Sequence, residues 1–124
     1  MAPPKGYYCL YEIQACFSSE SNHYGIYVQT DEGGVGQFFH VRCAVGKTGM
    51  MFERQYFLGP GPEALATFKN KTYIGIVKGE DLDRMADICS TIDAPETQFI
   101  DSTCQCGTWV DKVHGVLKAQ GILG

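Results

Sequence analysis

The sequence predicts an α+β domain in which an antiparallel sheet of about five strands precedes two helices. Three observations lead to this fold class. Runs rich in aromatic and β-branched residues fill the first two thirds of the chain, and glycine-containing turns separate them. Apolar residues then recur at helical spacing in two segments near the end of the chain. Strands that precede helices, rather than alternate with them, favour an antiparallel sheet.

Each predicted strand is an apolar and aromatic run bounded by turn-forming residues. The five runs are 7–17 (YYCLYEIQACF), 23–30 (HYGIYVQT), 37–45 (QFFHVRCAV), 50–59 (MMFERQYFLG) and 71–79 (KTYIGIVKG). Side chains alternate along a strand, so in the third run Phe38, His40 and Arg42 share one face. The residue that follows each of them lies on the other face.

Two helices complete the predicted domain. The segment 80–92 has acidic residues in its first turn, which complement the helix dipole, and apolar residues at helical spacing, namely Leu82, Met85, Ala86 and Cys89. The second helix runs from about Cys106 to Gln120, and Gly121 ends it. Its predicted buried face consists of Trp109, Val110, Val113 and Leu117. The whole chain, 1–124, is therefore interpreted as one domain with a flexible leader over residues 1–6.

Composition excludes several classes of function. Fourteen acidic and ten basic residues give a net charge of −4, and the basic residues form no cluster, so nucleic acid is not an expected partner. No apolar run approaches the length of about 18 residues that a membrane span needs. The first residues do not resemble a signal peptide, so we expect a cytoplasmic protein whose six cysteines are mostly reduced thiols. The oligomeric state is left open.

A cysteine and two histidines form the candidate site. Cys106 begins a predicted helix, where the dipole and free N–H groups favour the thiolate, which is the nucleophilic form. A thiolate nucleophile needs a base that later acts as an acid, and histidine suits this role near neutral pH. His23 and His40 lie on predicted neighbouring strands, and one can orient the other. His114 is eight residues along the same helix, more than about 10 Å from Cys106, and is expected to be a surface residue.

Three segments also resemble a known enzyme family. The segments NHYGIYV, QFFHV and QCGTWV (22–28, 37–41 and 105–110) are similar to the histidine strand, second-histidine strand and cysteine helix of lecithin retinol acyltransferase-like proteins. That family has a circularly permuted papain-like thiol fold, which it shares with NlpC-type proteins. Small fungal proteins of unassigned function, with an H-x-GI strand, an NCQ-x-WV helix and a GIL tail, look closer still.

The resemblance implies a function and a role for each site residue. It implies a hydrolase or acyltransferase that acts on an acyl, ester or amide carbonyl through a thioester acyl-enzyme, with no metal and no cofactor. Cys106, three residues before the aromatic, would be the nucleophile, His23 the base, and His40 the residue that orients His23. A small-molecule, lipid or peptide acyl substrate would then contact Tyr24, Gln105 and Trp109.

This chain also departs from the family. Gln105 stands where the family has Asn, the loop between the two histidines is longer, and the hydrophobic C-terminal anchor is absent. An alignment on the CQ dipeptide selects Cys104 as the nucleophile instead, and it needs two extra residues before the tryptophan. In the preferred alignment Cys104 is a neighbour or a redox partner of Cys106.

Four alternatives stay open beside the catalytic interpretation. A zinc site could use His40, Cys43, Cys104 and Cys106, although strand alternation separates the first two. Cys104 and Cys106 could form a redox pair, although their spacing is not that of thioredoxin. The domain could be a binding module without catalysis, or an isopeptidase similar to permuted deSUMOylating enzymes. Six aromatic residues could line a substrate pocket, although strand aromatics more often fill a core. They are Tyr24, Tyr27, Phe38, Tyr56, Phe57 and Trp109.

Overall fold

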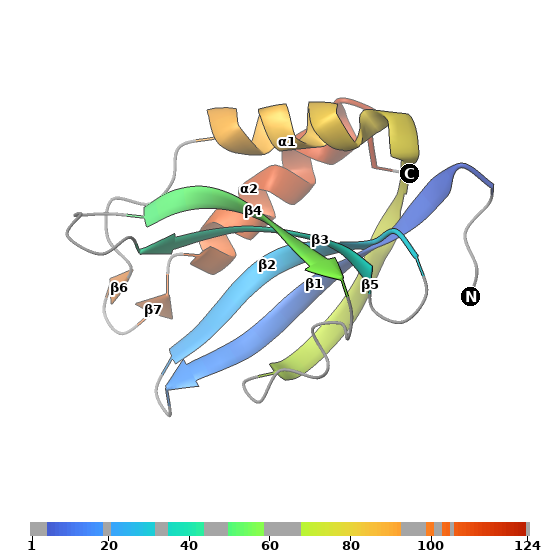
Figure 1. The fold of residues 1–124 in the computed structure, drawn as a ribbon. Helices are drawn as coiled ribbons and strands as arrows, with labels where there is room; N and C mark the ends of the chain where they lie inside the picture. Colours follow the sequence, from blue (N-terminus) through green and yellow to red (C-terminus); the bar gives the residue numbers. More distant parts are fainter. Residues whose placement is uncertain are drawn as a thin grey trace.

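A computed structural model describes most of the chain and consists of one sheet with two helices on one of its faces (Figure 1). It describes the backbone of residues 5–18, 21–31, 35–43, 50–58, 68–92, 99–100, 103–104 and 106–123. The side chains of 15–18, 21–23, 42–43, 50–51, 68–69, 99–100, 103–104 and 106–108 lie outside this description. Within the described part, no helix is both long and apolar enough to cross a membrane.

The main sheet has five antiparallel strands in the order β4-β3-β2-β1-β5. The strands are β1 (Tyr7–Ser18), β2 (Ser21–Gln29), β3 (Val35–Cys43), β4 (Met50–Leu58) and β5 (Phe68–Lys78). The first four strands add to the sheet in chain order, and β5 pairs with β1 at the opposite edge from β4. The α+β class, with an antiparallel five-stranded sheet followed by two helices, is confirmed.

The helices follow the fifth strand, as predicted. A 3₁₀ turn over Gly79–Asp81 leads into α1 (Leu82–Thr91), and α2 (Cys106–Ala119) closes the domain. Between them, two short strands that were not predicted pair with each other: β6 (Phe99–Ile100) and β7 (Thr103–Cys104). The fifth strand also begins three residues earlier than predicted, because Phe68 pairs with Ala15 of β1.

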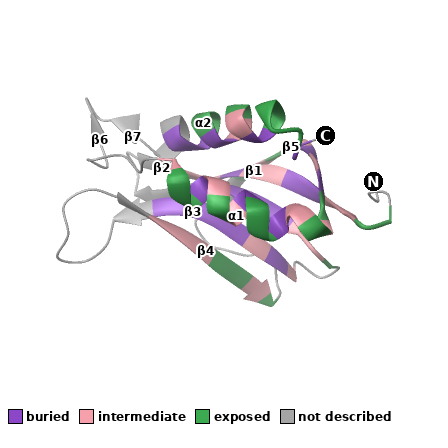
Figure 2. Ribbon diagram, turned by 90° about the horizontal axis from the view of Figure 1, so that it is seen from above, coloured by how far each residue is buried: buried purple, intermediate pink, exposed green. Residues whose placement is uncertain are grey.

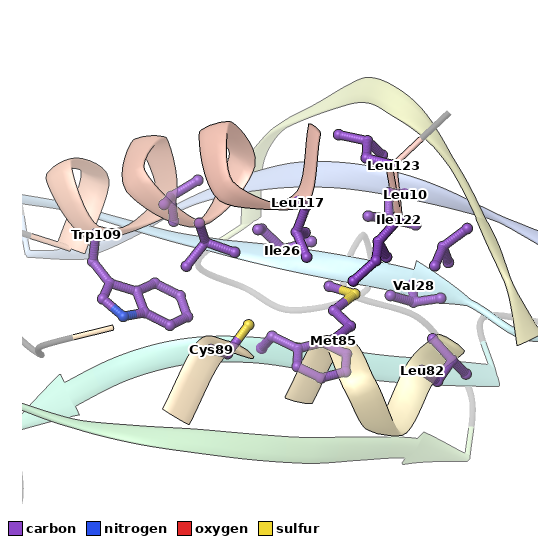
Figure 3. Packing of buried hydrophobic residues seen from close by; sticks show 14 of the residues in the cluster. Leu10, Ile26, Val28, Leu82, Met85, Cys89, Trp109, Leu117, Ile122 and Leu123 are labelled. Atoms are coloured by element: carbon purple, nitrogen blue, oxygen red, sulfur yellow. The ribbon is translucent and has the colours of Figure 1, made fainter. Parts of the chain in front are cut away.

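The main core lies between the two helices and the sheet. Strand alternation turns Ile26, Val28, Phe39 and Val41 of the central strands toward the helices. Figure 2 shows that the buried residues of α1 and α2 face the sheet while their outer residues are exposed. The predicted buried face of α2 is confirmed, and in α1 Leu82, Met85 and Cys89 are buried as expected. Trp109 lies at one end of this core, and Leu82 and Leu123 lie toward the other (Figure 3).

A second, smaller cluster occupies the opposite face of the sheet. Ile13, Tyr27 and Phe38 are buried there, and Tyr11 and Phe57 pack against them. The ring centroids of Phe38 and Phe57 lie 6.0 Å apart in a stacked arrangement. We call this cluster the aromatic face. The sheet therefore carries apolar residues on both faces, and alternation decides to which cluster each residue belongs.

The C-terminal end of α2 has a well-defined stop. Gly121 adopts φ +72°, a left-handed conformation that glycine reaches without a steric penalty. The Gly121 N–H donates to the carbonyl of Lys118, and the Ile122 N–H donates to the carbonyl of Leu117. These two bonds form a Schellman motif. The chain thereby turns back, and Ile122 and Leu123 enter the main core.

Candidate active site

The backbone brings the strand of His23 and the helix of Cys106 into contact. Cys106 is the first residue of α2, as predicted, and His23 lies in β2 opposite Ala15. The helix packs against β2 and β3, and β7, which ends two residues before Cys106, lies against β2. The side chains of Cys106 and His23 lie outside the described residues, so their separation remains a prediction.

His40 is the one predicted catalytic residue whose side chain the structure describes. It is only 5% exposed, and its ring packs against Phe38 with 4.5 Å between the ring centroids. Its Nε2 atom lies 3.3 Å from Oε1 of Glu53, the residue directly opposite it on β4. His40 therefore sits on the aromatic face, across the sheet from the packing face of α2, and is held by a carboxylate.

Gly25 makes the close packing around His40 possible. It lies two residues after His23 in β2, and the ring of Phe38 occupies the space that a Cβ atom at this position would fill. That Cβ would also lie 3.0 Å from the Cβ of His40. A glycine at this position of a strand marks a close approach of a neighbouring group to the backbone. The close packing of Phe38 and His40 against β2 thus explains why a glycine stands two residues after His23.

The three predicted substrate-contacting residues do not share one environment. Tyr24 is half-buried and packs against the main core, whereas Trp109 is 1% exposed and lies inside it. The Trp109 indole packs against Phe52 with ring centroids 5.8 Å apart, and its Nε1 has no hydrogen-bond partner among the described residues. Gln105 lies outside the described residues.

The expectation that the strand aromatics could line one pocket is wrong, because strand alternation divides them between the two faces of the sheet. Tyr27, Phe38 and Phe57 belong to the aromatic face. Tyr24 and Trp109 belong to the main core, and Tyr56 is 60% exposed. Most of these rings fill cores, which was the commoner of the two expectations.

Two of the six cysteines have described side chains, Cys9 and Cys89, and both are buried and outside any disulfide. Burial raises the pKa of Cys89 to about 12, an effect that nearby Arg54 only partly opposes. A thiol with so high a pKa stays protonated near neutral pH and reacts slowly with electrophiles. The thiols of Cys43, Cys104 and Cys106, on which the zinc and redox alternatives depend, lie outside the described side chains. Among those that are described, no group of three His, Cys, Asp or Glu residues could hold a metal.

A carboxylate on β1 faces α2 away from the predicted catalytic residues. Burial raises the pKa of Glu12, the negative charge of Asp111 raises it further, and His114 acts in the opposite direction. His114 is not a plain surface residue, since it is half-buried and its Nε2 has no hydrogen-bond partner among the described residues.

Glu12→Gln is expected to stabilise the protein at pH 7. Because the pKa of Glu12 is raised in the folded state, the folded chain binds the carboxyl proton more tightly than the unfolded chain does. The free energy of unfolding therefore falls as the pH rises from the unfolded-state pKa of Glu12 through its folded-state pKa. The substitution removes this loss, a gain of about 0.5 kcal/mol or less for a side chain that is only partly buried. Urea unfolding at pH 7 and pH 3 checks it: the gain should vanish at pH 3. Glu80→Gln, at an exposed position, is the matched control, and an equal gain in that variant would contradict the assignment to Glu12.

The comparison with family models covers nearly the whole chain. Residues 10–124 match the model described as a family of unknown function, DUF6540. The chain belongs to the DUF6540 family. The matched region contains all but the first three residues of β1, the other described strands, both helices and all three predicted catalytic residues. No curated protein and no solved structure matches the chain.

Sequence reasoning did not find Glu53. It lies thirteen residues after His40, and only the register of β3 with β4 reveals that the two residues are opposite each other. A signal was present, because the two strands are adjacent in the chain and one carries a histidine and the other a carboxylate at matching positions. The register depends on the intervening turn, which sequence alone did not define.

Proposed function

We propose that this DUF6540 domain is a cysteine-dependent hydrolase or acyltransferase of the permuted papain-like type. Cys106 is the nucleophile, His23 the general base and acid, and His40 the residue that orients His23. The substrate contains an acyl, ester or amide carbonyl, and Tyr24, Gln105 and Trp109 are the candidates for substrate contact that the family resemblance suggests.

One observation carries this proposal: α2 begins at Cys106 and packs on the strand that contains His23. The N-terminus of a 14-residue helix favours a thiolate, because free N–H groups and the helix dipole stabilise negative charge there. β7 lies on β2, so the chain that leads into Cys106 also runs close to the histidine strand. The neighbouring strand β3 holds a buried histidine, His40, which contacts Glu53 on the face of the sheet opposite to α2.

The proposed reaction has two halves. His23 takes the proton from the Cys106 thiol, the thiolate forms a bond to the carbonyl carbon, and backbone N–H groups at the start of α2 stabilise the oxyanion. His23 then protonates the leaving group, whose bond to carbon breaks, and a thioester remains. Water or a second nucleophile gives its proton to His23 and attacks the thioester, which releases the acyl group and the thiolate.

Thiol reactivity tests the proposal directly. Native protein treated with iodoacetamide at pH 7 should be modified first at Cys106, as read by peptide mass spectrometry. His23→Ala should slow this modification by about tenfold or more, since general-base assistance contributes about 10²–10⁴-fold in enzymes. His114→Ala, the same substitution at the histidine on α2, is the matched control and should leave the rate unchanged. Cys89 serves as an internal unreactive thiol because its pKa is about 12.

Other results of the iodoacetamide experiment would each indicate a different function. Similar modification of several cysteines, unaffected by His23→Ala, would contradict the proposal and favour a binding module. Fastest modification of Cys104 would move the nucleophile by two residues. A panel of thioester, ester and amide substrates, with Cys106→Ser as the inactive reference, then identifies the carbonyl class. Cleavage of an extended isopeptide substrate alone would identify an isopeptidase.

A further inference from the structure

Strand β4 forms one outer edge of the main sheet and carries exposed apolar side chains (Figure 1). Among the described strands it pairs with β3 alone. Leu58 is 89% exposed and Tyr56 60% exposed, and Gln55 is exposed as well. The C-terminal half of β4 therefore presents two large apolar side chains to solvent at the edge of the sheet.

The opposite edge of the sheet, formed by β5, has features that discourage further strand pairing. Natural proteins protect edge strands with bulges, lysines or short length. The ladder between β5 and β1 shifts register twice, and β5 contains three lysines. β4, in contrast, pairs with β3 along all nine of its residues without a shift, and it contains no lysine and no proline. The edge at β4 is thus the regular one, and a further strand can be added to it.

The two charged side chains of β4 have partners within the domain. Oε1 of Glu53 lies 3.3 Å from Nε2 of His40. Arg54 donates from Nε to Oε1 of Gln37 over 2.7 Å and from a terminal nitrogen to Oδ1 of Asp83 over 3.1 Å. Charges that are paired in this way repel an incoming strand less than unpaired charges would.

We propose that β4 pairs antiparallel with β4 of a second copy of this chain, which joins the two sheets into one. Two copies related by a two-fold axis present the same surface to each other, so the residue on the axis faces its own counterpart. An axis at Glu53 or Arg54 would oppose like charges, which destabilises a strand pair. An axis at Tyr56 would set Leu58 against Arg54. An axis at Gln55 avoids both arrangements.

The register centred on Gln55 also gives the exposed side chains suitable neighbours. It sets Leu58 of each copy against Phe52 of the other, and Tyr56 against Arg54. The Arg54 guanidinium already lies 5.5 Å from the centroid of the Tyr56 ring in its own strand, so a ring from the second copy would approach the same cation. Apolar pairs and cation–aromatic pairs both stabilise directly opposed positions of a sheet.

Sedimentation velocity over a wide range of protein concentration tests the proposal, in reducing buffer so that no disulfide links two chains. We expect native protein to form a dimer. Gln55→Lys and Gln55→Glu each place like charges on the axis, so each variant alone should halve the observed mass at concentrations where the native chain is dimeric. An equal mixture of the two variants should restore the dimer, because opposite charges then face each other. Gln55 is exposed, so neither change should disturb the fold.

Thr72→Lys is the matched control, since Thr72 is also exposed but lies on β5, at the other edge. This variant should stay dimeric. A native chain that is monomeric at every concentration would overturn the proposal. So would a dimer that persists in both Gln55 variants, or a mixture of these variants that stays monomeric. None of these results depends on the proposed function, which thiol reactivity tests separately.

Discussion

Trp109→Ala is expected to lower the free energy of unfolding by about 3–5 kcal/mol, the usual range for removing a buried aromatic ring. The Trp109 side chain is 1% exposed and packs between α2 and the sheet, with the ring of Phe52 5.8 Å away. Because a domain of this size has a net stability of only about 5–15 kcal/mol, the variant should be close to unfolding at 37 °C. Urea titration followed by far-ultraviolet circular dichroism measures the change.

Tyr73→Ala is the matched control for this result. Tyr73 is also aromatic, but it lies on β5 on the aromatic face and is 48% exposed. We expect its replacement to cost about 1 kcal/mol, the typical effect of a point substitution. Equal losses in the two variants would contradict the placement of Trp109 in the main core. Trp109→Phe should retain much of the native stability, because most of the buried ring area remains.

Gly25→Ala is expected to destabilise the fold by about 1–3 kcal/mol, the range for overpacking a filled interior. The added methyl group would meet the ring of Phe38 and the Cβ of His40, and Phe38 itself packs against Phe57. Since Phe38 also contacts the His40 ring, the imidazole should shift as well. Urea unfolding measures the first effect, and the ¹⁵N shifts of His40 report the second.

Gly115→Ala provides a control with the opposite sign. Gly115 lies on the exposed side of α2, and a Cβ there would meet nothing within 4 Å. Replacing a helical glycine by alanine at such a position gains up to about 1 kcal/mol, because the unfolded chain loses conformational freedom. If Gly25→Ala also stabilises the protein, the close approach of Phe38 to β2 is wrong.

Local patterns in the sequence predicted most of the architecture. Alternation along residues 37–41 correctly placed Phe38 and His40 on the face opposite to Phe39 and Val41. Helical spacing correctly predicted the buried residues of both helices, and Cys106 was correctly placed at the start of α2. These features depend on how apolar residues are spaced within one strand or helix, so that segment alone contains enough information to predict them.

Features that depend on a second segment were harder to predict. Phe68 extends β5 because it pairs with Ala15, and nothing near Phe68 in the sequence indicates that partner. Glu53 was missed for the same reason, since its importance comes from the residue opposite it. Alternation sorts the aromatic rings between the two faces of the sheet, but which face the helices cover depends on the relative placement of strands and helices. Pairing and layer order are properties of the whole fold, and local periodicity does not contain them.

The register of β3 with β4 has a consequence for how the length of this chain can vary among its relatives. His40 meets Glu53 across thirteen positions, and alternation gives the two faces of each strand very different neighbours. One residue inserted or deleted within the paired part of either strand would either form a bulge or place a residue of the opposite face against the imidazole. A change of two residues there would preserve the faces. Family members that keep this pair should therefore keep the spacing of the paired residues on each strand or change it by an even number.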